Sequence, residues 1–274
     1  MGPPSRENAT VTPRAAPPPR RRHPTNGPDV PTSPPGDSAA SGPPSEAALD
    51  GGAGLFHALY TTRALRRFRP DPIPEDVLFQ ILDAAIRAPT GQNAQDWRFI
   101  VVTDAAVKQR MQDGALEGWN RYSRRYADDP AQIGALPRSQ RLSLRSVEHL
   151  AHHLAEAPAV ILVCGLHGRH STPGGSSFPA VQNLLLAARA LGVGGSIFNL
   201  PLRDPAALKS MLDIPENNDI VCVLPIGYPS DKIGPVRRKP VKKVVYREKF
   251  GQVWDFAAAQ PDDGWGARWI PDDA

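Results

Sequence analysis

The stretch Phe178–Leu191 is apolar on almost every side of the helix that its residue spacing predicts. A helix of this kind is buried inside a fold, because no face of it is polar enough to meet water. Two continuous apolar runs, Ala159–Cys164 and Ile220–Ile226, are typical of strands that are covered on both faces. The sequence therefore requires a core in which a sheet and a central helix pack together.

The other predicted elements alternate between helix and strand without a regular repeat. Pro74 starts a helix with Glu75 and Asp76 in its first turn, and Pro89 ends it. Further helices are predicted over Leu55–Tyr60, from about Ala105, and over Val147–Leu154 and Pro205–Leu212, and further strands over Trp97–Val102 and Gly195–Phe198. Residues 110–145 are polar and only weakly helical. This irregular alternation lacks the regular spacing of a doubly wound fold.

The first 54 residues do not contribute to this core. They hold thirteen of the 31 prolines and show no apolar periodicity, which is typical of a disordered Pro-rich tail. The run Arg20–Arg22 in this tail fits a solvated linker better than a nucleic-acid or membrane contact. We therefore expect one folded domain over residues 55–256, followed by a polar C-terminal extension over residues 257–274.

Charge and cysteine content narrow the functional classes. The tail is neutral, and the rest of the chain carries 27 Lys and Arg against 23 Asp and Glu, an excess too small to require nucleic acid. No apolar run is long enough for a transmembrane helix, and the N-terminus lacks the apolar region of a secretory signal. We therefore expect a cytoplasmic protein with no membrane partner. Cys164 and Cys222 allow one disulfide but indicate no metal site.

Three short motifs contain residues suited to a phosphate-bearing ligand. They are the arginine cluster at 63–67, the turn Pro89-Thr90-Gly91-Gln92-Asn93, and the basic run Arg237-Arg238-Lys239. Arginine offers phosphate a permanent charge and two parallel donors, which lysine does not. Taken singly, each motif is more typical of a solvated surface or an ordinary turn than of a binding site.

Taken together and in this order, the motifs resemble one family over about residues 55–250. The stretch Thr62-Arg63-Ala64-Leu65-Arg66-Arg67-Phe68 resembles the opening signature of the nitroreductase-like flavoproteins. The stretch from Ala88 to Trp97 resembles their Pro-Ser turn at the right distance. Gln182–Ala188 and the following Leu191-Gly192-Val193-Gly194 resemble their central helix and glycine loop, and Ile226-Gly227-Tyr228-Pro229 with Arg237–Val241 resembles their last strand and basic loop.

The resemblance implies an α+β fold with a mixed central sheet, and one FMN at each of two sites in a homodimer interface. It also implies that Arg63, Ala64 and Arg66, with Arg67 as neighbour, follow the ribityl phosphate and the pyrimidine edge of the flavin. Ala64 stands where the family often has Ser, so one hydroxyl contact is missing here.

The remaining motifs have corresponding roles under the same resemblance. Pro89, Thr90 and Asn93, supported by Gln95, match a turn that meets the flavin from the other subunit. Gly194, Gly195 and Ser196 match a loop whose backbone approaches the flavin N5, where a Cβ would clash with the ring. Arg238, with Arg237 beside it, matches the loop that clamps the phosphate.

The function implied is an FMN-dependent oxidoreductase that uses NADH or NADPH and passes hydride to a nitroaromatic, quinone or similar small acceptor by a ping-pong mechanism. The flavin carries this chemistry, so no catalytic side chain is expected and none is assigned. The same site would serve an alternative function, a specialised flavin oxidase or dehydrogenase acting on a biosynthetic intermediate. A third alternative is a flavin-binding or nucleic-acid-associated protein without turnover.

Three further groups of residues fit structural roles better than chemical ones. His149, His152 and His153 have metal-ligand spacing, but a surface or interface helix explains them better. His167 and His170 lie in a Gly/Ser-rich loop that could border the site. Three aromatic residues lie in the region where the family builds a lid over its acceptor: Trp119, Tyr122 and Tyr126.

Overall fold

The computed structural model describes residues 54–127, 130–166, 175–234, 236 and 238–260, and of residues 125–127, 130 and 131 only the backbone. The expected tail at 1–54 and the extension at 257–274 therefore lie almost entirely outside the described residues, and both remain predictions.

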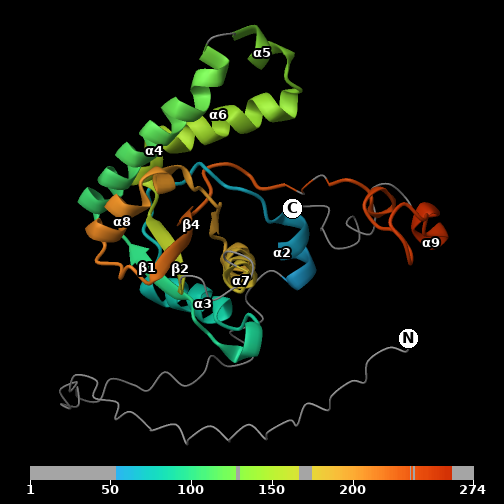
Figure 1. Cartoon of the computed structure of the whole chain (residues 1–274), viewed down its shortest axis with the longest axis horizontal. Helices are drawn as coiled ribbons and strands as arrows, with labels where there is room; N and C mark the ends of the chain where they lie inside the picture. Colours follow the sequence, from blue (N-terminus) through green and yellow to red (C-terminus); the bar gives the residue numbers. More distant parts are fainter. Residues whose placement is uncertain (1–53, 128–129, 167–174, 235, 237, 261–274) are drawn as a thin grey trace, which may run out of the picture. The chain divides into compact units, whose positions relative to one another are not determined.

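Four strands form the sheet at the centre of the described chain (Figure 1). They are β1 (Arg98–Val102), β2 (Ala159–Leu166), β3 (Gly194–Gly195) and β4 (Asn218–Gly227), in the order β1-β2-β4-β3. Each neighbouring pair is antiparallel. The α+β class is confirmed, but the sheet within the described residues is antiparallel and not mixed, because every strand runs opposite to its neighbours.

Helices cover both faces of this sheet, which explains the continuous apolar strands. Alternate residues of β2 belong to two separate apolar clusters: Val160, Leu162 and Cys164 to one, and Ala159, Ile161 and Val163 to the other. The first cluster includes side chains of α4, α6 and α8, and the second includes side chains of α3 and α7. Both faces of β2 are therefore covered, as its sequence predicts.

The helices follow the predicted order. Their bounds are α2 (Leu55–Thr61), α3 (Glu75–Ala85), α4 (Ala105–Ala127), α5 (Pro130–Ala135), α6 (Arg138–His153), α7 (Ser177–Ala190), α8 (Pro205–Met211) and α9 (Asp255–Ala258). Short 3-10 turns lie at Gly91–Asn93, Leu154–Glu156, Leu200–Arg203 and Val241–Lys243. Asp104 caps α4, since its Oδ1 accepts from the Val107 amide at 2.8 Å. Gly192 ends α7 in the left-handed region, with φ at 77°.

The region 110–145 is more helical than its composition indicates. It forms most of α4, all of α5 and the first half of α6, and α4 and α6 pack side by side (Figure 1). Only a narrow stripe of α4 is buried, namely Met111, Ala115 and Trp119 at four-residue spacing, with Lys108 and Gly118 beside them. The rest of the surface is charged and obscures this stripe in the sequence.

The strand predicted over Gly195–Phe198 is present only at Gly194–Gly195. A side chain interrupts the ladder beyond it: Asn199 Oδ1 accepts the Val223 amide at 3.1 Å, although the Phe198 amide still donates to Val223 O at 2.8 Å. The chain therefore leaves the sheet shortly after Ser196.

The two cysteines lie on neighbouring strands, but they do not form the disulfide that their number allows. Cys164 and Cys222 are both free and buried, and they belong to different apolar clusters. Burial raises the pKa of the Cys164 thiol to about 11 and that of Cys222 to about 12. At neutral pH both are protonated core residues, not nucleophiles.

Candidate functional site

The arginine cluster at 63–67 lies beside the glycine loop. Helix α2 ends where Thr62 becomes extended, and its hydroxyl donates to Ala58 O. The segment after it then runs along the end of the sheet: the Leu65 amide donates to Gly195 O at 3.0 Å, and the Arg69 amide donates to Tyr228 O at 2.8 Å. These two bonds place residues 63–67 next to Gly194, Gly195 and Ser196.

Two side chains at this junction have buried polar atoms without partners. Arg66 Nε and Ser196 Oγ are the buried side-chain polar atoms that make no hydrogen bond to any described residue. Burial lowers the pKa of the Arg66 guanidinium. A buried donor without a partner costs on the order of 1–3 kcal/mol, so folded chains rarely keep one without a ligand or water to satisfy it. The two atoms are therefore candidates to contact a polar ligand.

The glycine loop is constrained by the protein itself. A Cβ on Gly195 would lie 2.7 Å from both Ile226 Cγ2 and Pro225 O, and a Cβ on Gly194 would lie 2.9 Å from Leu65 Cδ2. Glycine was expected here because a side chain would clash with a flavin ring. The packing of the protein already requires glycine, since β4 and the arginine segment exclude a side chain at both positions. Whether a ring approaches the backbone stays a prediction.

The basic loop reaches the same end of the sheet. The Val236 amide donates to Tyr60 O at 3.0 Å, which holds this loop against the last turn of α2, three residues before Arg63. Arg238 is exposed two residues further on, and Arg237 lies outside the described residues. The backbone path therefore brings Arg238, the predicted phosphate clamp, to the side of the sheet where Arg63 lies. Ala64 is exposed and contributes no hydroxyl.

The turn after α3 is built separately from this cluster. Thr90 Oγ1 accepts from the Gln95 amide at 3.1 Å, and Asn93 Oδ1 accepts from Gln95 Nε2 at 3.0 Å, so Gln95 supports the turn. Gln92, Asn93 and Gln95 all have positive φ, between 47° and 55°. Left-handed backbone at three side-chain-bearing residues is unfavourable and is concentrated at functional sites.

The turn is also placed at a different end of the core. The Gly91 amide donates to Ser176 Oγ at 3.4 Å, and the flanking Ala88 and Trp97 pack on Ala180 of α7. Pro89 and Asn93 are exposed. The described contacts of the turn are thus with the start of α7.

Arg67 differs from Arg66 in its surroundings. It is exposed, and its Nη1 lies 3.2 Å from His149 Nδ1 on α6. Together with Phe68, His153, Glu156 and Ser230, these residues line a cavity of about 210 Å³. His149 was expected on a surface or interface helix, and the sequence held no signal of its contact with a residue 82 positions away.

The other residues singled out by the sequence are partly described. Trp119 is buried on α4 and stacks on Tyr122 with ring centroids 5.8 Å apart, so it packs within the helix pair. His167 and His170 lie outside the described residues, and so does the side chain of Tyr126.

In the described ranges, no three His, Cys, Asp or Glu residues are grouped to hold a metal ion. No described helix combines the length and apolarity needed to cross a bilayer.

Comparison with known proteins places this arrangement in one family. A model of the nitroreductase family matches residues 59–228. The NADH dehydrogenase of Thermus thermophilus is 28% identical over 195 residues, which cover 67% of this chain and 90% of the relative. The iodotyrosine deiodinase of Thermotoga neapolitana is also 28% identical, over 70% of this chain and 96% of that protein.

A solved structure confirms the likeness of the fold. Oxidized iodotyrosine deiodinase, bound to FMN and 3-iodo-L-tyrosine, superposes with a TM-score of 0.58 at 24% identity, over 72% of this chain and 100% of that one. The family match spans α2 through β4 and therefore includes the arginine segment, the strained turn and the glycine loop. The chain belongs to the nitroreductase family.

Proposed function

We propose that this protein is an FMN-dependent oxidoreductase that takes hydride from NADH or NADPH and passes it to a small electrophilic acceptor. The observation that carries the proposal is the pair of buried atoms without partners, Arg66 Nε and Ser196 Oγ, on segments joined by the Leu65–Gly195 hydrogen bond. A flavin pyrimidine offers acceptors to a donor such as Arg66, and the solved structure described above holds FMN.

The donors present fit FMN in kind. Arg66 would face the pyrimidine edge, Ser196 would supply a hydroxyl, and Arg63 and Arg238 would hold the phosphate. When bound, the cofactor supplies two-electron chemistry, accepting hydride from the nicotinamide and releasing it to the acceptor. The chain binds and orients both partners, and Arg66 favours negative charge on the ligand it faces through its permanent cation. Protons come from solvent in this scheme, consistent with the lack of an assigned acid or base.

A homodimer follows from the surface of α2 and α7. These helices pack on each other, yet Leu55 and Leu59 on α2 are 63% and 42% exposed, and Phe178 at the start of α7 is 42% exposed. Helix α7 was expected to be buried all round, but Leu185 and Leu186 are only partly buried. A second copy would cover this apolar surface and bring its strained turn to the arginine segment.

The dimer has a direct test in Leu59→Glu. A buried Leu stabilises by about 1.5–3 kcal/mol, and a two-fold interface contains each position twice, so this change should convert the dimer to monomer. Light scattering during gel filtration measures the mass. Leu142→Glu is the matched control, because Leu142 is 46% exposed on α6, away from α2 and α7. A Leu59→Glu protein that is still dimeric would contradict the interface.

The proposed chemistry is tested by the visible spectrum of the purified protein. Flavin absorbance that bleaches on anaerobic addition of NADH or NADPH, and returns with a nitroaromatic or quinone, is the expected result. Arg238→Ala should weaken FMN binding by about ten- to a hundredfold, because a charge-assisted bond contributes about 1.5–3 kcal/mol. A variant that keeps full flavin through gel filtration would remove Arg238 from the site. A colourless wild type that takes up no FMN would overturn the function.

Reductive dehalogenation of a halogenated phenol is a second candidate, favoured by relatives named iodotyrosine deiodinase. The same reduced protein distinguishes the two candidates: 3-iodo-L-tyrosine should restore the flavin spectrum and release iodide if dehalogenation is the reaction. Slow recovery with this acceptor, against rapid recovery with a quinone, would favour the first candidate.

A further inference from the structure

The cavity beside Arg67 has the size and the polar lining of a second ligand site. It holds about 210 Å³ and is lined by Arg66, Arg67, Phe68, His149, His153, Glu156 and Ser230. A water molecule occupies about 30 Å³ of the liquid, so this cavity admits a small ion with part of its hydration. The lining comes from three parts of the chain: the arginine segment, the C-terminal end of α6 with the turn after it, and the loop after β4.

Arg67 contributes a guanidinium with most of its hydrogen-bonding capacity unused. Its Nη1 lies 3.2 Å from Nδ1 and 3.4 Å from Nε2 of His149, and no carboxylate of the described chain pairs with it. A guanidinium has five N–H donors, arranged to hold two oxygens at once. In contrast, Arg69, two residues along, is paired with Asp71 at 3.0 Å and lies over the Tyr228 ring.

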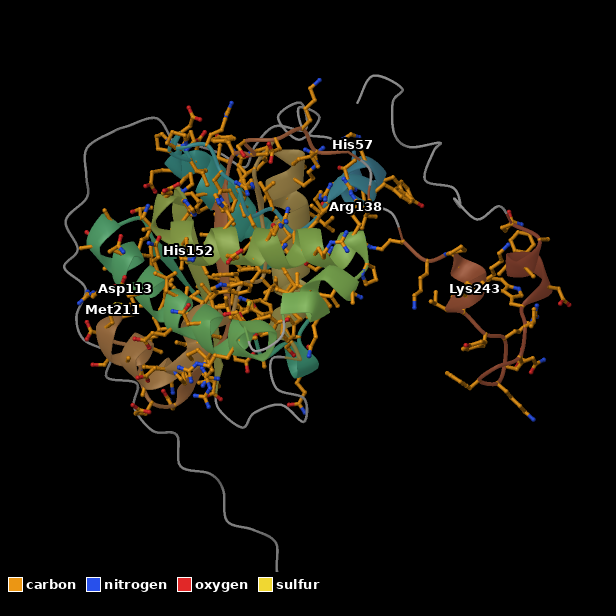
Figure 2. The ribbon with its side chains drawn as sticks, turned by 90° about the horizontal axis from the view of Figure 1, so that it is seen from above. His57, Asp113, Arg138, His152, Met211 and Lys243 are labelled. Atoms are coloured by element: carbon orange, nitrogen blue, oxygen red, sulfur yellow. The ribbon has the colours of Figure 1, made fainter. Side chains whose placement is uncertain are left out.

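Two imidazoles extend this positive side of the cavity. The rings of His149 and His153 stack with centroids 4.1 Å apart, and His153 Nδ1 lies 2.7 Å from His149 O. Burial lowers the pKa of His149, as do the nearby Arg67 and His153, whereas Glu156 and Asp231 raise it. His152, labelled in Figure 2, is exposed and does not line the cavity.

We propose that this cavity binds an oxyanion of the phosphate or sulfate class, with Arg67 as the main ligand and His149, His153 and Ser230 around it. An anion here would offset the repulsion between Arg67 and a protonated His149. Glu156 is the one acidic group in the lining, and because its side chain is exposed, solvent screens it from the bound ion. The cavity adjoins the proposed flavin site, because Arg66 lines it too, but the anion would be held by Arg67 and does not require the flavin.

Protons and the anion should bind together. The pKa of His149 is lowered in the empty cavity, and a bound anion would raise it, so His149 takes up a proton when the ion binds. Affinity is therefore expected to increase as the pH falls from about 8 to about 6. Sulfate is the better probe of this dependence, because its own charge does not change over that range.

The test is calorimetric titration of sulfate into the flavin-loaded protein at the two pH values, with the histidine ring signals followed by NMR. The expected result is saturable binding, roughly tenfold tighter at the lower pH, with a shift in the His149 signal. Arg67→Gln should weaken binding by tenfold or more. Arg69→Gln is the matched control, because it removes the same charge two residues away and should bind sulfate like the wild type.

The visible spectrum separates this proposal from the flavin site. Arg67→Gln should keep its flavin, and loss of flavin in this variant would return Arg67 to the cofactor and overturn the proposal. Unsaturable heats in the wild type, or equal affinities in the wild type and Arg67→Gln, would also overturn it. Where sulfate binds, its effect on the KM values for NADPH and NADH identifies the natural ligand of the cavity. If added sulfate raises the KM for NADPH alone, the site belongs to the extra phosphate of that nucleotide. If it raises neither KM, the site belongs to a free anion.

Discussion

Replacing Arg66 with glutamine is expected to stabilise the cofactor-free protein while weakening FMN binding by about ten- to a hundredfold. The buried Nε has no partner among the described residues, so glutamine, which has no charge and a shorter side chain, removes a group whose burial costs on the order of 1 kcal/mol. The flavin, in turn, loses a charge-assisted bond of about 1.5–3 kcal/mol. Denaturant unfolding of the apoprotein and fluorescence titration with FMN measure the two effects.

The opposite signs make this experiment specific. A residue that only supports the fold would lower the stability of the apoprotein and lower flavin affinity together. Arg66→Lys keeps the charge but not the planar donor group, and should fall between glutamine and the wild type in FMN affinity. An Arg66→Gln apoprotein that is less stable than the wild type would show that Arg66 has a structural role and that the buried Nε does not mark the ligand.

The second large effect is expected at Gly195. The added methyl of Gly195→Ala would meet the backbone oxygen of Pro225 at 2.7 Å, and a backbone atom in the middle of a sheet cannot move aside at low cost. Overpacking of this kind costs about 1–3 kcal/mol and would shift the loop that carries Ser196. We expect a lower free energy of unfolding, measured in urea, and a weaker FMN complex.

Two other glycines calibrate that result. Gly194→Ala meets chiefly the end of the Leu65 side chain, which can turn away, so a smaller loss of stability is expected. Gly134→Ala in α5 has no atom within 4 Å and should stabilise slightly, by up to about 1 kcal/mol, since alanine favours a helix. Equal stability of the Gly195→Ala and Gly134→Ala proteins would show that β4 does not exclude a side chain at 195.

The sequence predicts the parts of this fold in which a single feature decides the structure. The apolar runs of β2 and β4 predict strands that are covered on both faces. Gly192, with its positive φ, ends α7. The helices α4 and α6 were less evident, because their buried stripe is narrow and the rest of their surface is charged. The antiparallel order of the sheet depends on how distant strands pair, which no local pattern encodes.

The sequence likewise predicts some features of the candidate site and not others. The motifs identify which segments matter, and the Leu65–Gly195 and Val236–Tyr60 hydrogen bonds show that three of them meet. The sequence cannot distinguish Arg66 from Arg67, because neighbouring residues of one type look alike until the fold half-buries one and exposes the other. Nor can it show that β4 and Leu65, as well as any ligand, require glycine at 194 and 195.

Because both faces of β2 are covered, burial of apolar side chains does not by itself fix the register of this strand. In a half-exposed strand, a one-residue slip would place apolar side chains in water, and that penalty fixes the pairing. Here a slip would only exchange one apolar cluster for the other, so shape must fix the alignment instead. Two features favour one alignment on steric grounds. One is the irregular pairing between Val163 and Cys164. The other is Gly227, where a Cβ would lie 2.6 Å from Pro158 Cδ and 2.9 Å from Phe68, so a residue with a side chain does not fit there.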